Sequence, residues 1–438
     1  MALKNPILKI LGLAPRSVSD SCSVMSDSTL PAPQHPSNYC AWRQRQALAL
    51  VLALGLQLMQ LNRVSGEDHV DYRYEAYRED DQRISIDTHS MLFEVAPKRW
   101  LNIKGEMIFD AISGASPTGS PPPNQLIFLD PSSWGGVING DTNSTKVPVT
   151  KMTEKRYAGD LAATFSMGRH RFTPQLSYSQ ENDYISHGFA FNYAVDFNEK
   201  NTTLNLGWSA TWDRIFIDKD TPRETKRSKD SDDFLIGINQ LISPKTVATL
   251  NFTYGNARGY LDDQYKKVFF LNYPQNVLDV NDAAGDFEHR PSRRDHYTTY
   301  ASLTQYVTPL NASVEGSYRF FNDSYGVNAH TVGLAWYQKL GSRLVIAPMV
   351  RYHRQSAADF YAPVFPNYLH KPRYCSADYR LSELDTITGG LTVSVKAMDW
   401  LSFDFGYKRY VMNGLDKVTS QSAYPSANIF TIGARVWF

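Results

Sequence analysis

The segment that decides the fold stands at the carboxyl end, where Phe430–Phe438 reads FTIGARVWF. Every second residue is apolar: Phe430, Ile432, Ala434, Val436 and Phe438. The residues between them are Thr431, Gly433, Arg435 and Trp437. A period of two is typical of a β-strand with one face toward lipid and the other toward an enclosed polar interior. The terminal aromatic, Phe438, is typical of the assembly signal of outer-membrane barrels.

The same alternation recurs toward the amino end of the chain. In 401–410, for example, Leu401, Phe403 and Phe405 oppose Ser402, Asp404 and Gly406. A helix would show a period of 3.6 instead. About sixteen such segments are predicted: 70–78, 83–95, 100–112, 154–167, 170–180, 184–197, 201–217, 232–242, 246–260, 295–307, 310–321, 327–339, 343–358, 378–396, 400–411 and 428–438. An even number of this size is typical of single-chain bacterial barrels.

The connectors between these segments alternate between short and long. The short ones contain turn-forming residues, as in Gly168-Arg169, Ser243-Pro244-Lys245 and Gly341-Ser342. The other set is mostly long and includes 113–153 and 261–294, with short members at 79–82, 181–183 and 322–326. This segregation predicts tight turns on the periplasmic side and long loops outside. We therefore expect an all-β transmembrane antiparallel up-and-down β-barrel.

Composition limits the alternatives. A net charge of +1 gives no electrostatic reason to expect nucleic acid as a partner, whereas 26 Tyr, 22 Phe and 8 Trp fit aromatic girdles. Composition alone also fits a soluble β-sandwich or propeller, but those folds have no reason to segregate short and long connectors. Cys22 and Cys40 precede the expected cleavage point, so Cys375 is the single cysteine of the mature protein and is interpreted as incidental.

The first part of the chain carries an export pattern. Arg43 and Arg45 precede the apolar run Ala47–Leu61, and small residues follow at Val64-Ser65-Gly66. This order predicts a signal peptide. The domain organisation expected is therefore an extension and signal peptide over 1–67 and a barrel over 68–438, located in the outer membrane of a Gram-negative bacterium.

Charged residues of both signs fall on the predicted interior face. The candidates that we expect to line the lumen are Asp87, Asp160, Asp213, Glu315, Arg319, Arg351, Asp404, Lys408 and Arg435. They either pair and stay hydrated or form a constriction that filters solutes. His89, His330 and His353 could also face the lumen. No motif predicts a metal, cofactor or haem site.

Function is predicted more coarsely. The leading hypothesis is a non-enzymatic barrel that passes or binds a small solute, or a scaffold for a periplasmic partner. The alternative is a barrel hydrolase of the lipase or protease type, because His353, Ser356 and Asp359, with Ser376 and Asp378, fall near one predicted rim. The loop 113–153 is a candidate plug and the loop 261–294 a candidate binding surface.

Several stretches together resemble a bacterial outer-membrane barrel family known only as a domain of unknown function, commonly encoded beside a flavin-transferase-type protein. The stretches span nearly all of 68–438: 72–75 with 79–81, 109–119, 196–198 with 201–207, 355–361 and 376–382. The resemblance implies the barrel fold, the outer-membrane location and an association with extracytoplasmic redox chemistry, but no catalytic residues. Outer-membrane lipid, the barrel assembly machinery and a periplasmic protein are the partners expected. The long amino-terminal extension and Cys375 depart from the family pattern.

Overall fold

The computed structural model describes residues 68–119, 126–129, 136–139, 146–217, 225–270, 277–279, 285–365 and 371–438. The predicted extension and signal peptide over 1–67 lie outside the described residues. So do the proline run 121–123 and the pair 134–135 of the candidate plug loop. None of the described helices is long and apolar enough to cross a membrane.

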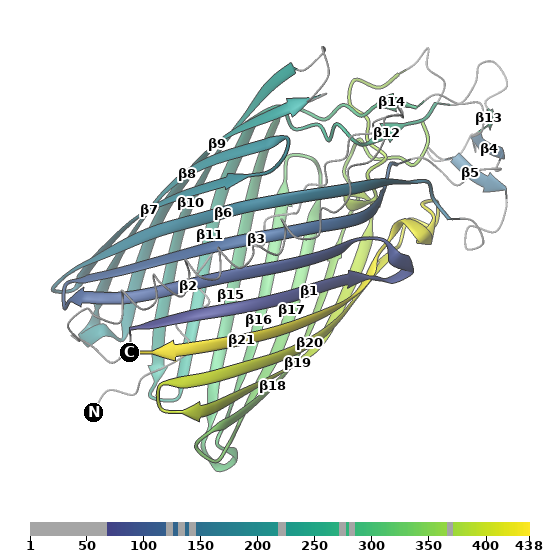
Figure 1. The fold of residues 1–438 in the computed structure, drawn as a ribbon. Coiled ribbons are helices and arrows are strands. Elements are labelled where there is room, and N and C mark those ends of the chain that lie inside the picture. Colours follow the sequence, from purple (N-terminus) through teal and green to yellow (C-terminus); the bar gives the residue numbers. More distant parts are fainter. Residues whose placement is uncertain are drawn as a thin grey trace, which may run out of the picture.

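Sixteen antiparallel strands of the described chain close into one barrel (Figure 1). In chain order they are β1 (His69–Glu79), β2 (Ser85–Lys98), β3 (Leu101–Pro117), β6 (Val149–Met167), β7 (His170–Gln180), β8 (Tyr184–Phe197), β9 (Thr202–Ile217), β10 (Thr225–Ser243), β11 (Thr246–Gly259), β15 (Arg293–Val307), β16 (Ala312–Asp323), β17 (Asn328–Leu340), β18 (Leu344–Gln355), β19 (Leu384–Met398), β20 (Leu401–Gly414) and β21 (Ser426–Trp437). The predicted fold class and strand number are confirmed.

The first and last barrel strands form the seam. β1 pairs with β21 over its full length, from His69 opposite Trp437 to Glu79 opposite Ala427. Next to the His69–Trp437 pair, the amide of Phe438 donates to the carbonyl of Asp68 at 3.1 Å. Closure leaves no unpaired strand edge, which is the condition for a sheet to span a bilayer.

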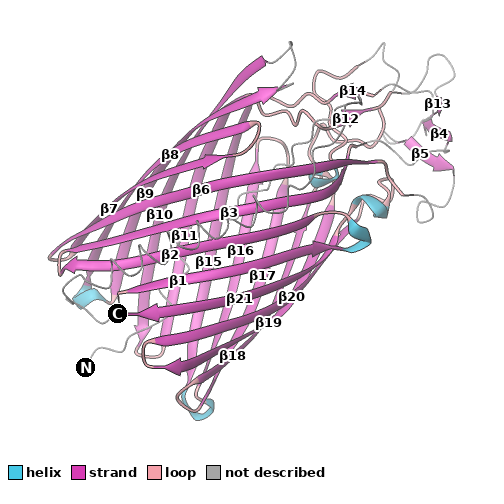
Figure 2. Cartoon of the chain, viewed as in Figure 1, coloured by secondary structure: helices cyan, strands magenta, loops and turns pink. Residues whose placement is uncertain are grey.

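The tight turns lie at one end of the barrel and the long loops at the other (Figure 2), where the short connectors 80–84, 181–183 and 324–327 also lie. The connector between β6 and β7 turns at Gly168, and that between β17 and β18 turns at Gly341. Both glycines have positive φ angles, 63° and 61°, which suit a tight turn. We call this the turn end and the opposite end the loop end. The predicted segregation of connectors is confirmed.

Some strand boundaries differ from those predicted. β3 continues to Pro117 and β6 begins at Val149, so the connector predicted as 113–153 is shorter than expected. β18 ends at Gln355. The segment 378–383, predicted as the start of a strand, is not one. The Asp378 carboxylate caps the amide of Arg380 and starts the 3-10 helix η6 (Tyr379–Leu381), so β19 begins only at Leu384.

The two faces of the wall differ as the alternation predicts. On β17, Val332 and Leu334 point outward and are about half exposed, at 53% and 51%, whereas Thr331, which immediately precedes Val332, points inward and is buried. Residues opposite one another in register share a face, so this assignment extends around the barrel. The outward set is dominated by large apolar side chains and the inward set by small and polar ones.

The loop end carries a folded layer. Two loops form it, and their described residues 260–270, 285–292, 356–365 and 371–383 are called the cap. The cap contains the short strands β12 (Lys267–Val268) and β14 (Asp286–Phe287), which pair with each other. A second small sheet joins β13 (Val277–Asp279), β4 (Leu126–Leu129) and β5 (Gly136–Asn139). Most of the buried apolar clusters lie here rather than inside the barrel.

Candidate functional site

The register places eight of the nine lumen candidates on the inward face. Arg435 is opposite Asp71 and Ser402, Asp404 is opposite Ser394, and Arg351 is opposite Gly333. Following these pairs around the wall gives the inward set: Asp160, Asp213, Glu315, Arg319, Arg351, Asp404, Lys408 and Arg435.

Asp87 is the exception, and its prediction was wrong. It is opposite Ala76 on the outward face, where its carboxylate accepts from Tyr74 and Arg78. Asp87 is the third residue of β2 counted from the loop end. Near a membrane boundary, a charged pair with a tyrosine can face outward because polar headgroups and water are within reach. Strict alternation cannot reveal this.

The histidines also divide between the faces. His89 and His330 point outward, and each bonds through Nδ1 to a tyrosine hydroxyl, of Tyr72 and Tyr318 respectively, at 2.8 Å. His353 points inward and bonds to Thr331 at 2.8 Å. Among the described residues no three His, Cys, Asp or Glu side chains could hold a metal ion together.

Several lumen charges are paired. Arg435 binds Asp71 through two nitrogens at 2.5 Å each, and Lys229 lies 3.1 Å from Asp213. Two further inward pairs are Arg156 with Asp110 and Arg171 with Asp196, both at 2.5 Å. For these residues, pairing accounts for the charge in the wall.

Three cations on the inward faces of β16, β18 and β20 are not paired in this way. Arg319, Arg351 and Lys408 are each the eighth residue of a strand that starts at the turn end, namely β16, β18 and β20. Equal positions on alternate parallel-running strands put them at one level. No carboxylate among the described residues lies within 4 Å of any of the three. We call them the basic arc.

Two carboxylates face the basic arc across the lumen. Glu106 on β3 and Asp160 on β6 are opposite each other in register, and we call them the acidic pair. Asp160 is the eighth residue from the turn end of β6, and it accepts from Gln175 Nε2 at 2.9 Å. β3 and β6 are the third and fourth strands of the sixteen, and β16, β18 and β20 are the eleventh, thirteenth and fifteenth, so the acidic pair is six to eight strands from Arg319 and Arg351 but only four or five from Lys408.

The cap reaches across the mouth at the loop end. Its 260–270 segment contacts two distant parts of the rim: Lys266 Nζ donates to the carbonyl of Pro117 at 2.6 Å, and Gln264 donates to Asp183 at 2.8 Å. Within the cap, Asp263 pairs with Arg380 of the other loop at 2.6 Å. Pro117 ends the third strand, whereas the segment starts from the ninth. In Figure 1, β12 and β14 lie at the loop end.

A buried ion network holds the two cap loops together. Arg290 lies 2.6 Å from Glu288 and 2.9 Å from Asp378, and Arg380 lies 2.6 Å from both Asp378 and Asp263. Burial raises the pKa of Glu288 to about 7, although Arg290 favours its carboxylate. Burial also opposes the charge on Asp378, but Arg380, Lys266 and Arg290 hold its pKa well below the usual range. Removing one member would leave a buried charge without its partner.

Cys375 is part of the apolar core of the cap, a role that its interpretation as incidental missed. It is fully buried and packs with Val268, Phe365 and Ala377. Its backbone forms a two-way bridge with His289, with N···O distances of 2.8 and 2.9 Å. Burial raises the pKa of the Cys375 thiol. A long-range loop contact of this kind has no periodic signal in the sequence.

The residues of the predicted hydrolase site have other contacts. The Ser356 hydroxyl donates to the carbonyl of Gly326 at 3.2 Å and accepts from the amide of Asn328 at 2.9 Å. His353 bonds to Thr331 and, at 3.4 Å, to Gln355. Ser376 donates to Glu288 at 2.6 Å inside the buried network. The structure therefore does not bring Ser356 and His353 together as a nucleophile and its base.

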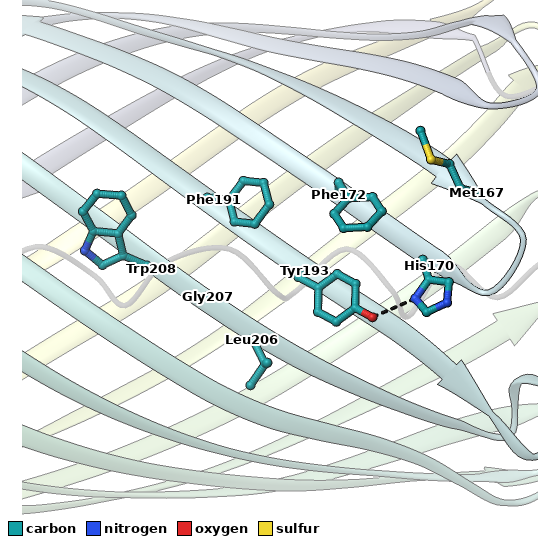
Figure 3. Close-up of a pocket in the computed structure, with 8 residues that line it drawn as sticks. All are labelled: Met167, His170, Phe172, Phe191, Tyr193, Leu206, Gly207 and Trp208. Atoms are coloured by element: carbon teal, nitrogen blue, oxygen red, sulfur yellow. Dashed lines mark hydrogen bonds between the residues drawn. The ribbon is translucent and has the colours of Figure 1, made fainter.

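The outer wall carries a groove of about 720 Å³ near the turn end (Figure 3). His170 Nδ1 and the Tyr193 hydroxyl are 2.7 Å apart at one side of it. The lining is mostly apolar and outward-facing: Met167, His170, Phe172, Phe191, Tyr193, Leu206, Gly207 and Trp208. The groove belongs to the surface that faces lipid and is separate from the lumen.

A closed antiparallel barrel with an apolar outer wall and a charged interior defines the class of this molecule: a β-barrel protein of the outer-membrane type. The chain belongs to a family described as proteins of unknown function, DUF3570, whose model matches residues 46–425. No curated protein sequence matches it.

Solved outer-membrane proteins are similar to the chain in fold. The siderophore receptor PirA from Pseudomonas aeruginosa is 8% identical with a TM-score of 0.41, and the match covers 85% of this chain and 62% of the receptor. OmpT from Vibrio cholerae is 9% identical with a TM-score of 0.40, covering 85% and 98%. The CymD monoaromatic hydrocarbon channel is 7% identical with a TM-score of 0.39, covering 85% and 88%. The chain spans less than two thirds of the receptor's length.

Proposed function

We propose that this protein is a non-enzymatic channel of the Gram-negative outer membrane that passes small polar solutes through its lumen. The turn end would face the periplasm, and the cap would lie at the outer mouth. A barrel of sixteen strands is wide enough for an aqueous path. The solute would approach through or beside the cap and pass the charged level formed by the basic arc and the acidic pair.

The observation that carries this proposal is the set of cations at one level of the inward face that have no carboxylate partner among the described residues. A wall that needed charge only for solubility would gain most from cross-strand pairs such as Asp71 with Arg435. Leaving Arg319, Arg351 and Lys408 without carboxylate partners among the described residues costs electrostatic free energy, because like charges on alternate strands of one wall repel. Interior charges that a passing solute can contact are what a selective pore requires.

The test is conductance of the purified protein in a planar lipid bilayer. We expect discrete current steps in potassium chloride, with a solute-dependent decrease when small polar compounds are added. A folded barrel that stays silent over many insertions would contradict the channel and favour a scaffold for a periplasmic partner. In that case, a flavin-transferase-type protein would be the first candidate partner to test, by co-purification.

A further inference from the structure

Small inward-facing residues separate the three members of the basic arc. Between Arg319 and Arg351, β17 contributes Thr331 and Gly333; between Arg351 and Lys408, β19 contributes Thr388 and Gly390. The stem of Lys408 lies over Gly390, where a Cβ atom would come within 2.6 Å of its Cγ. Lys408 thus leans across β19 toward β18, and the inward residues of β17 and β19 that lie between the three cations are small.

The spacing suits a shared ligand. Alternate strands of a sheet are roughly 10 Å apart, and the two-residue offset between Thr331, opposite Arg319, and Gly333, opposite Arg351, brings the separation of the two arginines along the wall to roughly 12 Å. Arginine and lysine side chains are long enough for two neighbouring head groups to reach one small anion from that distance. The guanidinium groups of Arg319 and Arg351 are close enough to interact electrostatically with each other and with His353. His353 lies two residues beyond Arg351 on the same face.

Acidic groups do not neutralise the arc. Glu315 and Asp404 lie four residues nearer the turn end on β16 and β20, about 13 Å along each strand. The acidic pair differs from the arc in this respect, because nearby positive charges partly offset it. Lys104 interacts electrostatically with both Glu106 and Asp160, and Arg73 interacts with Glu106. The level as a whole therefore presents an uncompensated positive side and a partly compensated negative side.

We propose that the basic arc is a binding site for the anionic group of the transported solute, a small oxyanion such as a carboxylate or a phosphate. The two guanidinium forks would bind its oxygens with paired hydrogen bonds, and Lys408 would add a third cationic donor. This inference deepens the proposed channel function and names the solute class. It predicts an anion-selective path.

The experiment compares two readouts. The first is titration calorimetry of the detergent-solubilised protein with inorganic phosphate and, in a second arm, succinate. The second is the zero-current potential of the protein in a bilayer under a potassium chloride gradient. We expect the wild type to bind at least one of the two probes and to prefer chloride. If phosphate binds more tightly than succinate, the transported solute is a phosphate compound. If succinate binds more tightly, it is a carboxylate.

The variants test the arc against bulk charge. Arg319→Gln and Arg351→Gln should each weaken probe binding by about tenfold, because each removes charge-assisted hydrogen bonds to the anion. Arg351→Lys should fall between wild type and Arg351→Gln. Two matched controls each remove one cation: Lys104→Gln inside the lumen but outside the arc, and Arg354→Gln on the outward face of β18. Both should bind like wild type.

The outcomes separate the two proposals. A silent bilayer with arc-dependent binding would overturn the channel and keep the anion site. Conductance with binding and selectivity unchanged in the arc variants would overturn the anion site and keep the channel. An equal loss in Lys104→Gln would also overturn it, because bulk charge would then explain the effect. Each variant is first shown to keep the folded barrel by its heat-dependent mobility on a gel.

Discussion

At the scale of single residues, the cap depends on charges that have been removed from water. Glu288 is the clearest case: its carboxylate lies against Arg290 and accepts from Ser376, and its pKa is raised to about 7. Because the folded cap holds this proton more tightly than an opened cap does, Glu288 contributes most to cap stability below about pH 4.5, its ordinary pKa. That contribution is lost as the pH rises toward 7.

Glu288→Gln should remove this pH dependence. In wild type, we expect the equilibrium for cap opening to increase severalfold between pH 5 and pH 7.5. In the variant, this part of the increase should be absent, because glutamine does not titrate. The measurement is hydrogen exchange at the amides of His289 and Cys375, which bridge the two cap loops, corrected for the intrinsic rate. Equal pH slopes in both proteins would contradict this role of Glu288.

The positions of several single residues could be predicted from the sequence only in part. Arg319, Arg351 and Lys408 could be assigned to the interior from alternation, but their common level required strand starts and register. Asp87 was misplaced because its outward pairing with Tyr74 and Arg78 depends on depth in the membrane. Cys375 could not be placed in a core, because that core also needs Val268 and Phe270 from a loop about a hundred residues earlier.

At the scale of elements, the strands were predictable because hydrocarbon and a polar interior impose a two-residue period on every one of them. β7 and β8 begin and end at the predicted residues. The errors fall at the loop end, where strands such as β3 and β6 extend beyond the predicted segments. There the alternation weakens, since both faces meet polar surroundings.

A matched pair of substitutions on β17 tests the alternation. Leu334→Lys puts a charge on the outward face at the middle of the strand, and it should lower the free energy of unfolding by about 2–4 kcal/mol. Ala335→Lys faces inward opposite Glu315, so it should change the free energy by less than about 1 kcal/mol. Urea unfolding in lipid vesicles measures both. Similar losses in the two variants would refute the assignment of faces.

A third prediction concerns the cap as an element. Arg380→Gln leaves Asp378 and Asp263 buried without their shared cation, which costs about 3–5 kcal/mol locally and should release the cap. We expect conductance to rise while the barrel stays folded. Arg354→Gln is the control, because the Arg354–Glu383 pair is exposed and worth at most about 1 kcal/mol. Unchanged conductance in Arg380→Gln would mean that the cap does not limit the path.

At the scale of the whole molecule, the lumen exists only because the sheet closes into a barrel. Strand number, closure and the segregation of turns from loops were predictable, because each follows from the membrane acting on the entire chain. The cap was not, since its contacts join loops that are distant in sequence. With the sheet closed, one set of residues is enclosed and the basic arc faces a lumen. With the sheet open, the same residues would line no path.

A disulfide across the seam tests closure most directly. In a background without the native cysteines, Glu75→Cys with Thr431→Cys creates a pair that is opposite in register between β1 and β21. Tyr77→Cys with Thr431→Cys is offset by two residues, which puts the Cα atoms beyond disulfide reach. We expect a fast-migrating intramolecular species on a non-reducing gel for the first pair only. Absence of that species in both pairs, with the protein folded and oxidised, would contradict a closed barrel.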